Sequence, residues 1–319
     1  MLATTRRNVL LSSPAAALGM MAPLHLLSNT PAADPRGLGY FRYRIGDVTF
    51  TALYDGIWQK EHDEGFIQNA TVGETMNALA KAGLASDHVP IEFAPTLIEV
   101  GGKRILIDPG TGGQWVPTAG DMPRYLRAAG VGAGSIDTIL ISHFHPDHIF
   151  GLMEKETDAQ LFPDSEILVP EDEYTFWTDA GVFSKLPDAW HGLARRIQAT
   201  FPSWRNVTRI STGQEVAPRI RGLPTPGHTP GHTAFHIDTG EREVIVAGDV
   251  AITPALFVAH PDWRITFDAD PVLAQQTRRR LFDQVTADDA VIAGYHFGFP
   301  NAGSLRRNGS GYLFEPFAA

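Results

Sequence analysis

The segment 142–148 constrains this chain more than any other part of its sequence. It reads Ser-His-Phe-His-Pro-Asp-His and directly follows the apolar run Thr-Ile-Leu-Ile. Because side chains alternate along an extended strand, His143 and His145 project to the same side. The proline after them ends the strand and turns Asp147 and His148 back toward them. Four groups of the kind that bind zinc and similar metals therefore converge on a small volume.

Three further candidate ligands stand where other strands are expected to end. A turn at 225–232, bounded by glycine and proline, presents His228. Asp249 follows an apolar strand, and His296 follows another. The chain contains no cysteine, so nitrogen and oxygen atoms must hold any metal. These positions predict a metal site built from strand ends that are distant in sequence.

Hairpins and strand–helix units are mixed along the chain, and no glycine-rich linker divides it, which predicts one α+β domain over residues 34–319. The segment 59–89 is polar and is expected to be irregular around one helix, and it is long enough to rim a pocket. The expected hairpins are 41–53 and 96–107; the helices are 73–81, 122–129, 171–177 and 271–284; the other strands are 138–141, 166–169, 234–237, 243–247 and a last one at 290–293.

Residues 1–33 have the pattern of an export signal. Arg6 and Arg7 precede a modestly apolar run, 9–27, and small residues follow near position 30. Serine, proline and glycine interrupt the run, which makes it a poor membrane span. The paired arginines resemble the twin-arginine signal of bacteria. We therefore expect the mature protein to be periplasmic or secreted, without a stable membrane span.

The ordered motifs resemble those of the metallo-β-lactamase superfamily over residues 96–296. They are His-x-His-x-Asp-His, Pro-Gly-His-Thr-Pro-Gly-His, Gly-Asp after a strand, and a late histidine after a strand. The resemblance implies a four-layer αβ/βα sandwich with the metal site at the edge of the two sheets. It implies two divalent ions, zinc first, with manganese, cobalt and iron as alternatives. The implied ligands are His143, His145 and His228 for one ion, Asp147, His148 and His296 for the other, and Asp249 as the bridge.

Two nearby polar residues have expected supporting roles. His232 is the one rival to His228 as a ligand, and the family instead places it behind the ligands. Asp108 ends a strand in the position of the family's Asp-x-Gly motif. It either orients a ligand histidine through the far ring nitrogen or caps the following turn.

The resemblance also implies a mechanism, in which a metal-bridging hydroxide attacks the substrate and the catalytic carboxylates are Asp147 and Asp249. The whole chain looks most like the methyl parathion hydrolase group and its lactonase relatives. This neighbourhood predicts hydrolysis of organophosphate triesters and aryl esters. Lactonase activity, including hydrolysis of acyl-homoserine lactones, is the alternative. It ranks second because lactonases of the family usually carry a tyrosine where this chain has Ile252. The candidate pocket wall is Phe150, Phe176, Trp177, Phe183 and Ile252.

Charge and composition exclude or disfavour other functions. The formal net charge is −10, and it is −12 without residues 1–33, so nucleic acid is not an expected partner. Zinc β-lactamases with a cysteine ligand are excluded, although the all-histidine type is not. A glyoxalase II is expected to have clustered basic residues, whereas this chain has only scattered arginines after His228. A non-catalytic binding protein is expected to have lost some metal ligands, whereas all seven positions are filled here. A small-molecule ester is the expected partner, and the resemblance leaves a homodimer open.

Overall fold

A computed structural model describes residues 37–317, and these residues all fall in one compact unit. The expected export signal at 1–33 lies outside the described residues. None of the described helices is long and apolar enough to cross a membrane.

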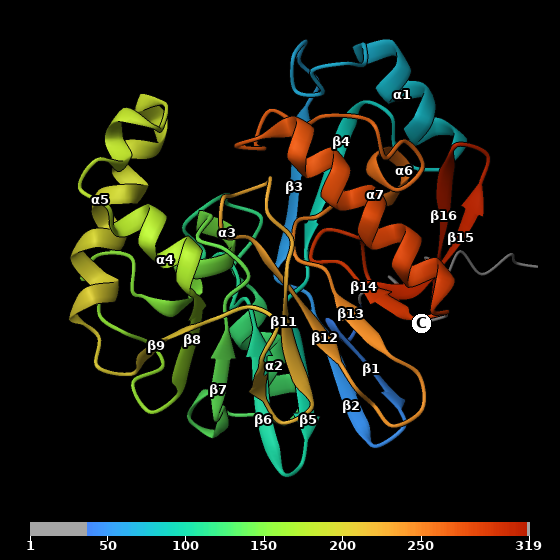
Figure 1. The fold of residues 1–319 in the computed structure, drawn as a ribbon. Coiled ribbons are helices and arrows are strands. Elements are labelled where there is room, and N and C mark those ends of the chain that lie inside the picture. The colour runs from blue at the N-terminus through green and yellow to red at the C-terminus, as the bar shows by residue number, and fades with distance from the viewer. Residues whose placement is uncertain (1–36, 318–319) are drawn as a thin grey trace, which may run out of the picture. The chain divides into compact units, whose positions relative to one another are not determined.

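Two seven-stranded sheets and a separate two-stranded ribbon make up the β structure (Figure 1). The first sheet has the order β1 (Tyr40–Ile45), β2 (Val48–Leu53), β5 (Thr96–Val100), β6 (Lys103–Ile107), β7 (Thr138–Leu140), β8 (Glu166–Pro170) and β9 (Val207–Ile210). The second has the order β10 (Glu215–Ala217), β11 (Ile220–Pro224), β12 (Thr233–Ile237), β13 (Val244–Val246), β14 (Val291–Ala293), β15 (Ala302–Asn308) and β16 (Gly311–Pro316). The ribbon pairs β3 (Gly56–Glu61) with β4 (His88–Phe93).

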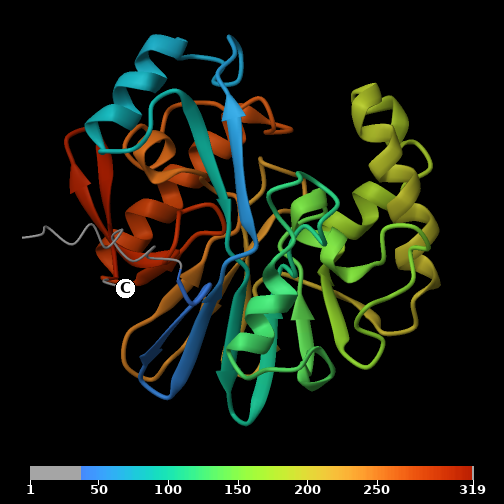
Figure 2. The same ribbon diagram turned by 180° about the vertical axis from the view of Figure 1, so that it is seen from behind.

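Helices cover the outer face of each sheet (Figures 1 and 2). One group consists of α2 (Met122–Ala128), α3 (Pro146–Ile149), α4 (Glu171–Thr178) and α5 (His191–Thr200). The other consists of α1 (Val72–Lys81), α6 (Pro254–Phe257) and α7 (Pro271–Ala287). Three buried apolar clusters separate the layers: one joins the two sheets, with Phe50 and Phe235 among its members, and one lies under each group of helices. The predicted four-layer αβ/βα sandwich is confirmed.

Strand direction brings the chemistry to one edge. In the first sheet β6, β7 and β8 are parallel, and in the second β13 and β14 are parallel, so their carboxyl ends meet at common edges. A backbone hydrogen bond joins the two edges, because Thr233 N donates to Ser142 O over 3.0 Å. The segments that follow these strands therefore face one another across the top of the sandwich.

The structure corrects two expectations about the elements. The segment 59–89 is irregular only at 62–71 and 82–87, on either side of its helix, because β3 extends to Glu61 and β4 begins at His88. The sequence does not predict β3, because its residues show no apolar alternation. It does not predict β4, because Pro90 interrupts a pattern in which alternate residues are buried. Pro90 is tolerated because the ribbon has only two strands. The strand at β14 is also not the last, since the hairpin β15–β16 follows it.

Candidate metal centre

The seven candidate ligands come from four segments at this edge. The loop and short helix α3 after β7 supply His143, His145, Asp147 and His148, and the turn before β12 supplies His228. The other two, Asp249 and His296, follow β13 and β14. Gly227 has φ +130°, and a Cβ there would meet Ala274 N at 2.3 Å. Glycine therefore lets the turn approach α7 closely enough to present its histidine.

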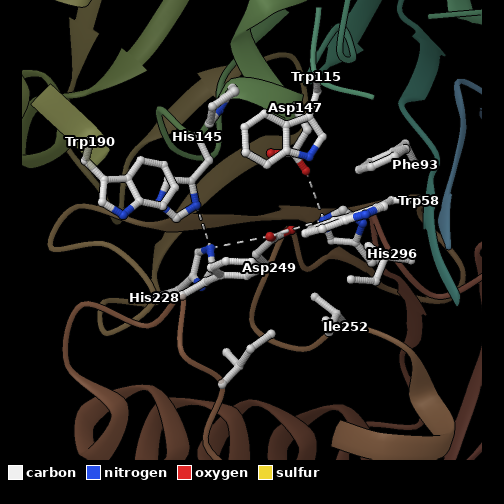
Figure 3. Close-up of a pocket in the computed structure, with 14 residues that line it drawn as sticks. Trp58, Phe93, Trp115, His145, Asp147, Trp190, His228, Asp249, Ile252 and His296 are labelled. Atoms are coloured by element: carbon white, nitrogen blue, oxygen red, sulfur yellow. Dashed lines mark hydrogen bonds and ion pairs between the residues drawn. The ribbon is translucent and has the colours of Figure 1, made fainter. Parts of the chain in front are cut away.

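The ligand atoms form two sets, of which Figure 3 labels His145 and His228 from one and Asp147, Asp249 and His296 from the other. One set is His143, His145 and His228, and the other is Asp147, His148, Asp249 and His296; within each set the atoms lie within 4.8 Å of one another. Asp249 contacts both sets. Its Oδ2 lies 3.4 Å from His228 Nε2 and 3.2 Å from His296 Nε2, while its Oδ1 lies 3.2 Å from His148 Nε2. This arrangement suits a carboxylate that bridges two cations.

Three ligand atoms of the centre are buried without a hydrogen bond, and such atoms are the test of whether cations fit. Among the described residues, His143 Nε2, His148 Nε2 and Asp249 Oδ1 are buried and accept or donate no hydrogen bond. Buried polar atoms are normally paired, because an unpaired one costs about 1–3 kcal/mol. Buried atoms of three candidate ligands that make no hydrogen bond fit metal ions.

Hydrogen bonds behind the ligands select the ring tautomers. Ser142 Oγ donates to Asp108 Oδ2 over 2.6 Å and accepts from His143 Nδ1 over 2.9 Å. Asp108 Oδ2 also accepts from His148 Nδ1 over 2.9 Å. Both imidazoles therefore carry a proton on Nδ1 and turn Nε2 toward the centre. Asp108 thus contacts the far ring nitrogen of His148, as the first of its two expected roles requires.

Similar contacts hold the remaining rings. His228 Nδ1 donates to Asp268 Oδ1 over 2.9 Å, and His296 Nδ1 donates to the backbone oxygen of Glu92 over 2.7 Å. His232 Nε2 accepts from the backbone nitrogen of Asp249 over 3.0 Å. The structure thus places His232 behind the bridging aspartate, outside both ligand sets.

Burial and charge divide the histidines into two groups. Burial and neighbouring histidines hold the pKa of His143 and of His145 well below the usual value, so both rings are neutral. Burial also lowers the pKa of His296, but Asp249 and Asp147 outweigh it and raise that pKa to about 9. The carboxylates likewise hold the pKa of His148 well above its usual value. Without metal, the second set is thus a group of ion pairs, and a cation would replace their protons.

A largely apolar chamber opens onto both ligand sets (Figure 3). Its only titratable side chains are candidate ligands. The other lining residues are Trp58, Ile91, Phe93, Trp115, Pro146, Trp190, Ile252, Ile265 and Phe267. Trp190 stacks on the ring of His145, with ring centroids 4.8 Å apart and planes at 23°. A second cavity adjoins this chamber and shares Trp190, Phe267, His145 and His228 with it.

The five expected wall residues are distributed unevenly. Ile252 lines the chamber, while Phe176 and Trp177 line the adjoining cavity. Phe150 and Phe183 lie outside both, because they pack against the core under the helices and face Arg196 and Arg195 respectively.

Sequence reasoning missed most of the wall and two supporting carboxylates. The missed wall residues stand on the β3–β4 ribbon and on loops, where aromatic side chains carry no periodic signal. Asp268 also stands in a loop. Glu173 is fully buried, but the sequence shows it only as one of three acidic residues in the first turn of α4, which is ordinary for a helix on the surface.

Comparisons with known proteins agree with this geometry. The sequence model of the Metallo-beta-lactamase superfamily matches residues 95–296. In Bacillus subtilis (strain 168), the uncharacterized protein YobT is 33% identical over 114 residues, which are 35% of this chain and 44% of YobT. The probable metallo-hydrolase YflN of the same organism is 30% identical over 128 residues, which are 37% of this chain and 46% of YflN. The chain thus spans less than half the length of either relative.

Solved structures extend the likeness to nearly the whole fold. The hydrolase AbOPH, in the beta lactamase superfamily, has a TM-score of 0.82 at 26% identity, over 88% of this chain and 98% of its own. AidC, a dizinc quorum-quenching lactonase solved in complex with a product, has a TM-score of 0.82 at 24% identity over the same shares. The two ligand sets, the bridging carboxylate and this fold describe a dinuclear metal site.

Proposed function

This chain belongs to the metallo-beta-lactamase superfamily, and we propose that its dinuclear site hydrolyses uncharged esters that carry an aryl or other apolar group. The observation that carries the proposal is the chamber, in which every titratable side chain is a candidate ligand and the remaining wall is apolar. Burying an apolar substrate group against such a wall makes the free energy of binding more favourable. Binding a charged substrate group there would cost free energy, because the charge would lose its water.

We propose zinc for both sites, with manganese, cobalt or iron as alternatives, because imidazole nitrogens and carboxylate oxygens are zinc ligands. When bound, a pair of divalent cations lowers the pKa of a coordinated water to about 7 and polarises a carbonyl or phosphoryl oxygen. Asp249 holds the two ligand sets together. Asp147 is the more exposed carboxylate, at 13% against 6%, and lines the chamber. The carboxylate of Asp147 is therefore the better placed of the two to accept a proton from the attacking water.

The departing group receives no obvious proton from the wall. The residues that line the chamber include no tyrosine, lysine, arginine, serine or threonine, and Ile252 occupies the position where a tyrosine would assist. Leaving groups that depart as stable anions need no acid, because these anions are weak bases whose conjugate acids, such as phenols, are comparatively acidic. Aryl esters and aryl phosphotriesters of the methyl parathion type are therefore the first candidate substrates.

Lactones are the second candidate. They are uncharged, and the same apolar wall suits the acyl chain of an acyl-homoserine lactone. AidC, which shares the fold, is named as a lactonase, although 24% identity establishes the fold alone. By contrast, no lysine or arginine of residues 37–317 lines the chamber to pair with the carboxylates of a β-lactam or a glutathione thioester. Those substrates are therefore less suited to this site.

A substrate panel tests the proposal. The purified chain, loaded with zinc, cobalt or manganese, would be assayed with methyl parathion, an aryl ester, an acyl-homoserine lactone, nitrocefin and S-lactoylglutathione. The expected order of kcat/KM places the aryl substrates first, the lactone second and the two charged substrates last. Asp249→Ala serves as the inactive control because it removes the bridge. Preference for nitrocefin or for the glutathione thioester would overturn the proposed substrate class.

A further inference from the structure

Glu173 is a fully buried carboxylate that accepts four hydrogen bonds and lies outside both ligand sets. Its Oε1 accepts from Phe144 N over 2.9 Å and from Trp177 Nε1 over 2.7 Å. Its Oε2 accepts from Thr229 Oγ1 over 2.7 Å and from Gly231 N over 3.0 Å. Each oxygen thus accepts two hydrogen bonds, so all of the lone pairs of an ionised carboxylate are used.

The donors belong to the segments that carry the first ligand set. Phe144 stands between His143 and His145, and Thr229 directly follows His228. The three ligands of this set are therefore each one residue from a contact of Glu173. No ligand of the second set adjoins a residue that donates to Glu173 in the described structure.

The packing shows that this contact is built closely. A Cβ on Gly231 would meet Glu173 N at 2.0 Å, so only glycine lets the turn before β12 lie against the backbone of α4. The turn belongs to the second sheet and Phe144 follows β7 of the first. Glu173 therefore ties two segments from different sheets at the point where their histidines must meet.

Only a carboxylate satisfies these donors. Burial raises the pKa of Glu173, and the hydrogen bonds from Thr229, Phe144, Trp177 and Gly231 oppose that effect. A glutamine of the same shape would turn its amide nitrogen toward two donors, whichever way it rotated. One pair of contacts would then become repulsive, and the two segments would separate.

We propose that Glu173 is a positioning residue for the first metal site, which holds His143, His145 and His228 in binding geometry and sets the metal affinity of that site selectively. The inference rests on the dinuclear site of the proposed function but not on any substrate. Residues that orient metal ligands commonly change metal affinity by about 10- to 100-fold when replaced.

Glu173→Gln tests the proposal by metal binding. Zinc affinities of wild type and variant would be measured by chelator competition, and anomalous diffraction from crystals grown at limiting zinc would assign occupancy to each ligand set. We expect the Kd of the first site to rise by about 10- to 100-fold and that of the second to stay within about threefold. Equal weakening of both sites, or no change at either, would overturn the proposal.

Two further variants separate positioning from general destabilisation. Asp55→Asn is the matched control, because Asp55 is also fully buried and accepts from Thr111 N, Thr111 Oγ1 and Met122 N, and neither donor residue adjoins a ligand of the first set. It should lower the melting temperature and leave the first-site Kd unchanged.

Thr229→Val removes one donor and keeps the side-chain shape, and it remains informative if Glu173→Gln does not fold. Thr229→Val should lower the zinc affinity of the first site alone, and by less than Glu173→Gln does. Thr229→Ser retains the hydroxyl and should therefore retain the zinc affinity of that site. A Thr229→Val protein with unchanged occupancy of both sites would contradict the proposal. A wild type that binds no metal would overturn the proposed function as well, whereas two tightly bound ions in Glu173→Gln would overturn only this inference.

Discussion

Replacing Trp58 with alanine should lower kcat/KM for an aryl ester by about an order of magnitude. Trp58 lies on β3 and lines the chamber. Its ring contacts Trp115 edge to face, with centroids 6.1 Å apart, and stacks near Phe267 at 6.3 Å. These three rings form a continuous aromatic wall against which an apolar substrate group would pack.

The size of the effect follows from the area that this wall would cover. An aromatic group buries about 150–250 Å² when it is enclosed. If Trp58 supplies about a third of that contact, its removal returns about 50–80 Å² to water, which costs about 1.2–2 kcal/mol at 25 cal/mol/Å². That free energy corresponds to a loss of about 8- to 30-fold in kcat/KM.

The assay compares the aryl ester with a small aliphatic ester, for which the loss should stay below about threefold. Trp204→Ala is the matched control, since Trp204 packs on Phe201 and lines neither cavity. It should leave the ratio of the two rates unchanged. An equal loss on both esters, or none on the aryl ester, would refute the assignment of this wall to substrate binding.

Three other predictions address the ligands and the N-terminus. Asp268→Asn weakens the acceptor of His228 Nδ1–H and should raise the zinc Kd by about 10- to 100-fold in a chelator competition, and an unchanged Kd would contradict this role. In the metal-free protein the pKa of His296 is raised to about 9, so its charged ring stabilises the fold below pH 6.5 and that contribution is lost as pH rises through 9. Zinc must displace this proton, so its affinity should increase with pH up to about 9, and calorimetry in buffers of different ionisation enthalpy should detect proton release. We also propose that residues 1–33 direct export: a reporter fused to them should reach the periplasm, lysines at positions 6 and 7 should stop it, and a reporter retained by the unaltered segment would contradict the proposal.

The clustering of the candidate ligands and the fold could be predicted from the sequence because their signals are local. His143, His145, Asp147 and His148 occupy one short segment, and each of the other ligands follows an apolar strand or a glycine-bounded turn. Strand ends of parallel strands meet at one edge, so sequence position predicts spatial position for these residues. The superfamily motifs then supplied the layer order of the sandwich.

The chamber could not be predicted in the same way. Trp58 lies in a ribbon whose alternation is weak, and Trp115 and Trp190 lie on a loop and a short 3₁₀ turn. Their partners are distant in sequence, and only the folded chain brings them together. Phe150 and Phe183 were chosen as aromatic residues near the ligands in sequence, but the helical layer directs both away from the metal centre.

A zinc titration of the stripped protein tests the dinuclear hydrolase most directly. A chelator would first remove metal, and bound zinc and the rate of aryl ester hydrolysis would then be measured together as zinc is added. The account predicts negligible activity without metal and a plateau at two zinc ions per chain, because the two ligand sets share Asp249. Full activity in the stripped protein, or a plateau with no bound zinc, would contradict it.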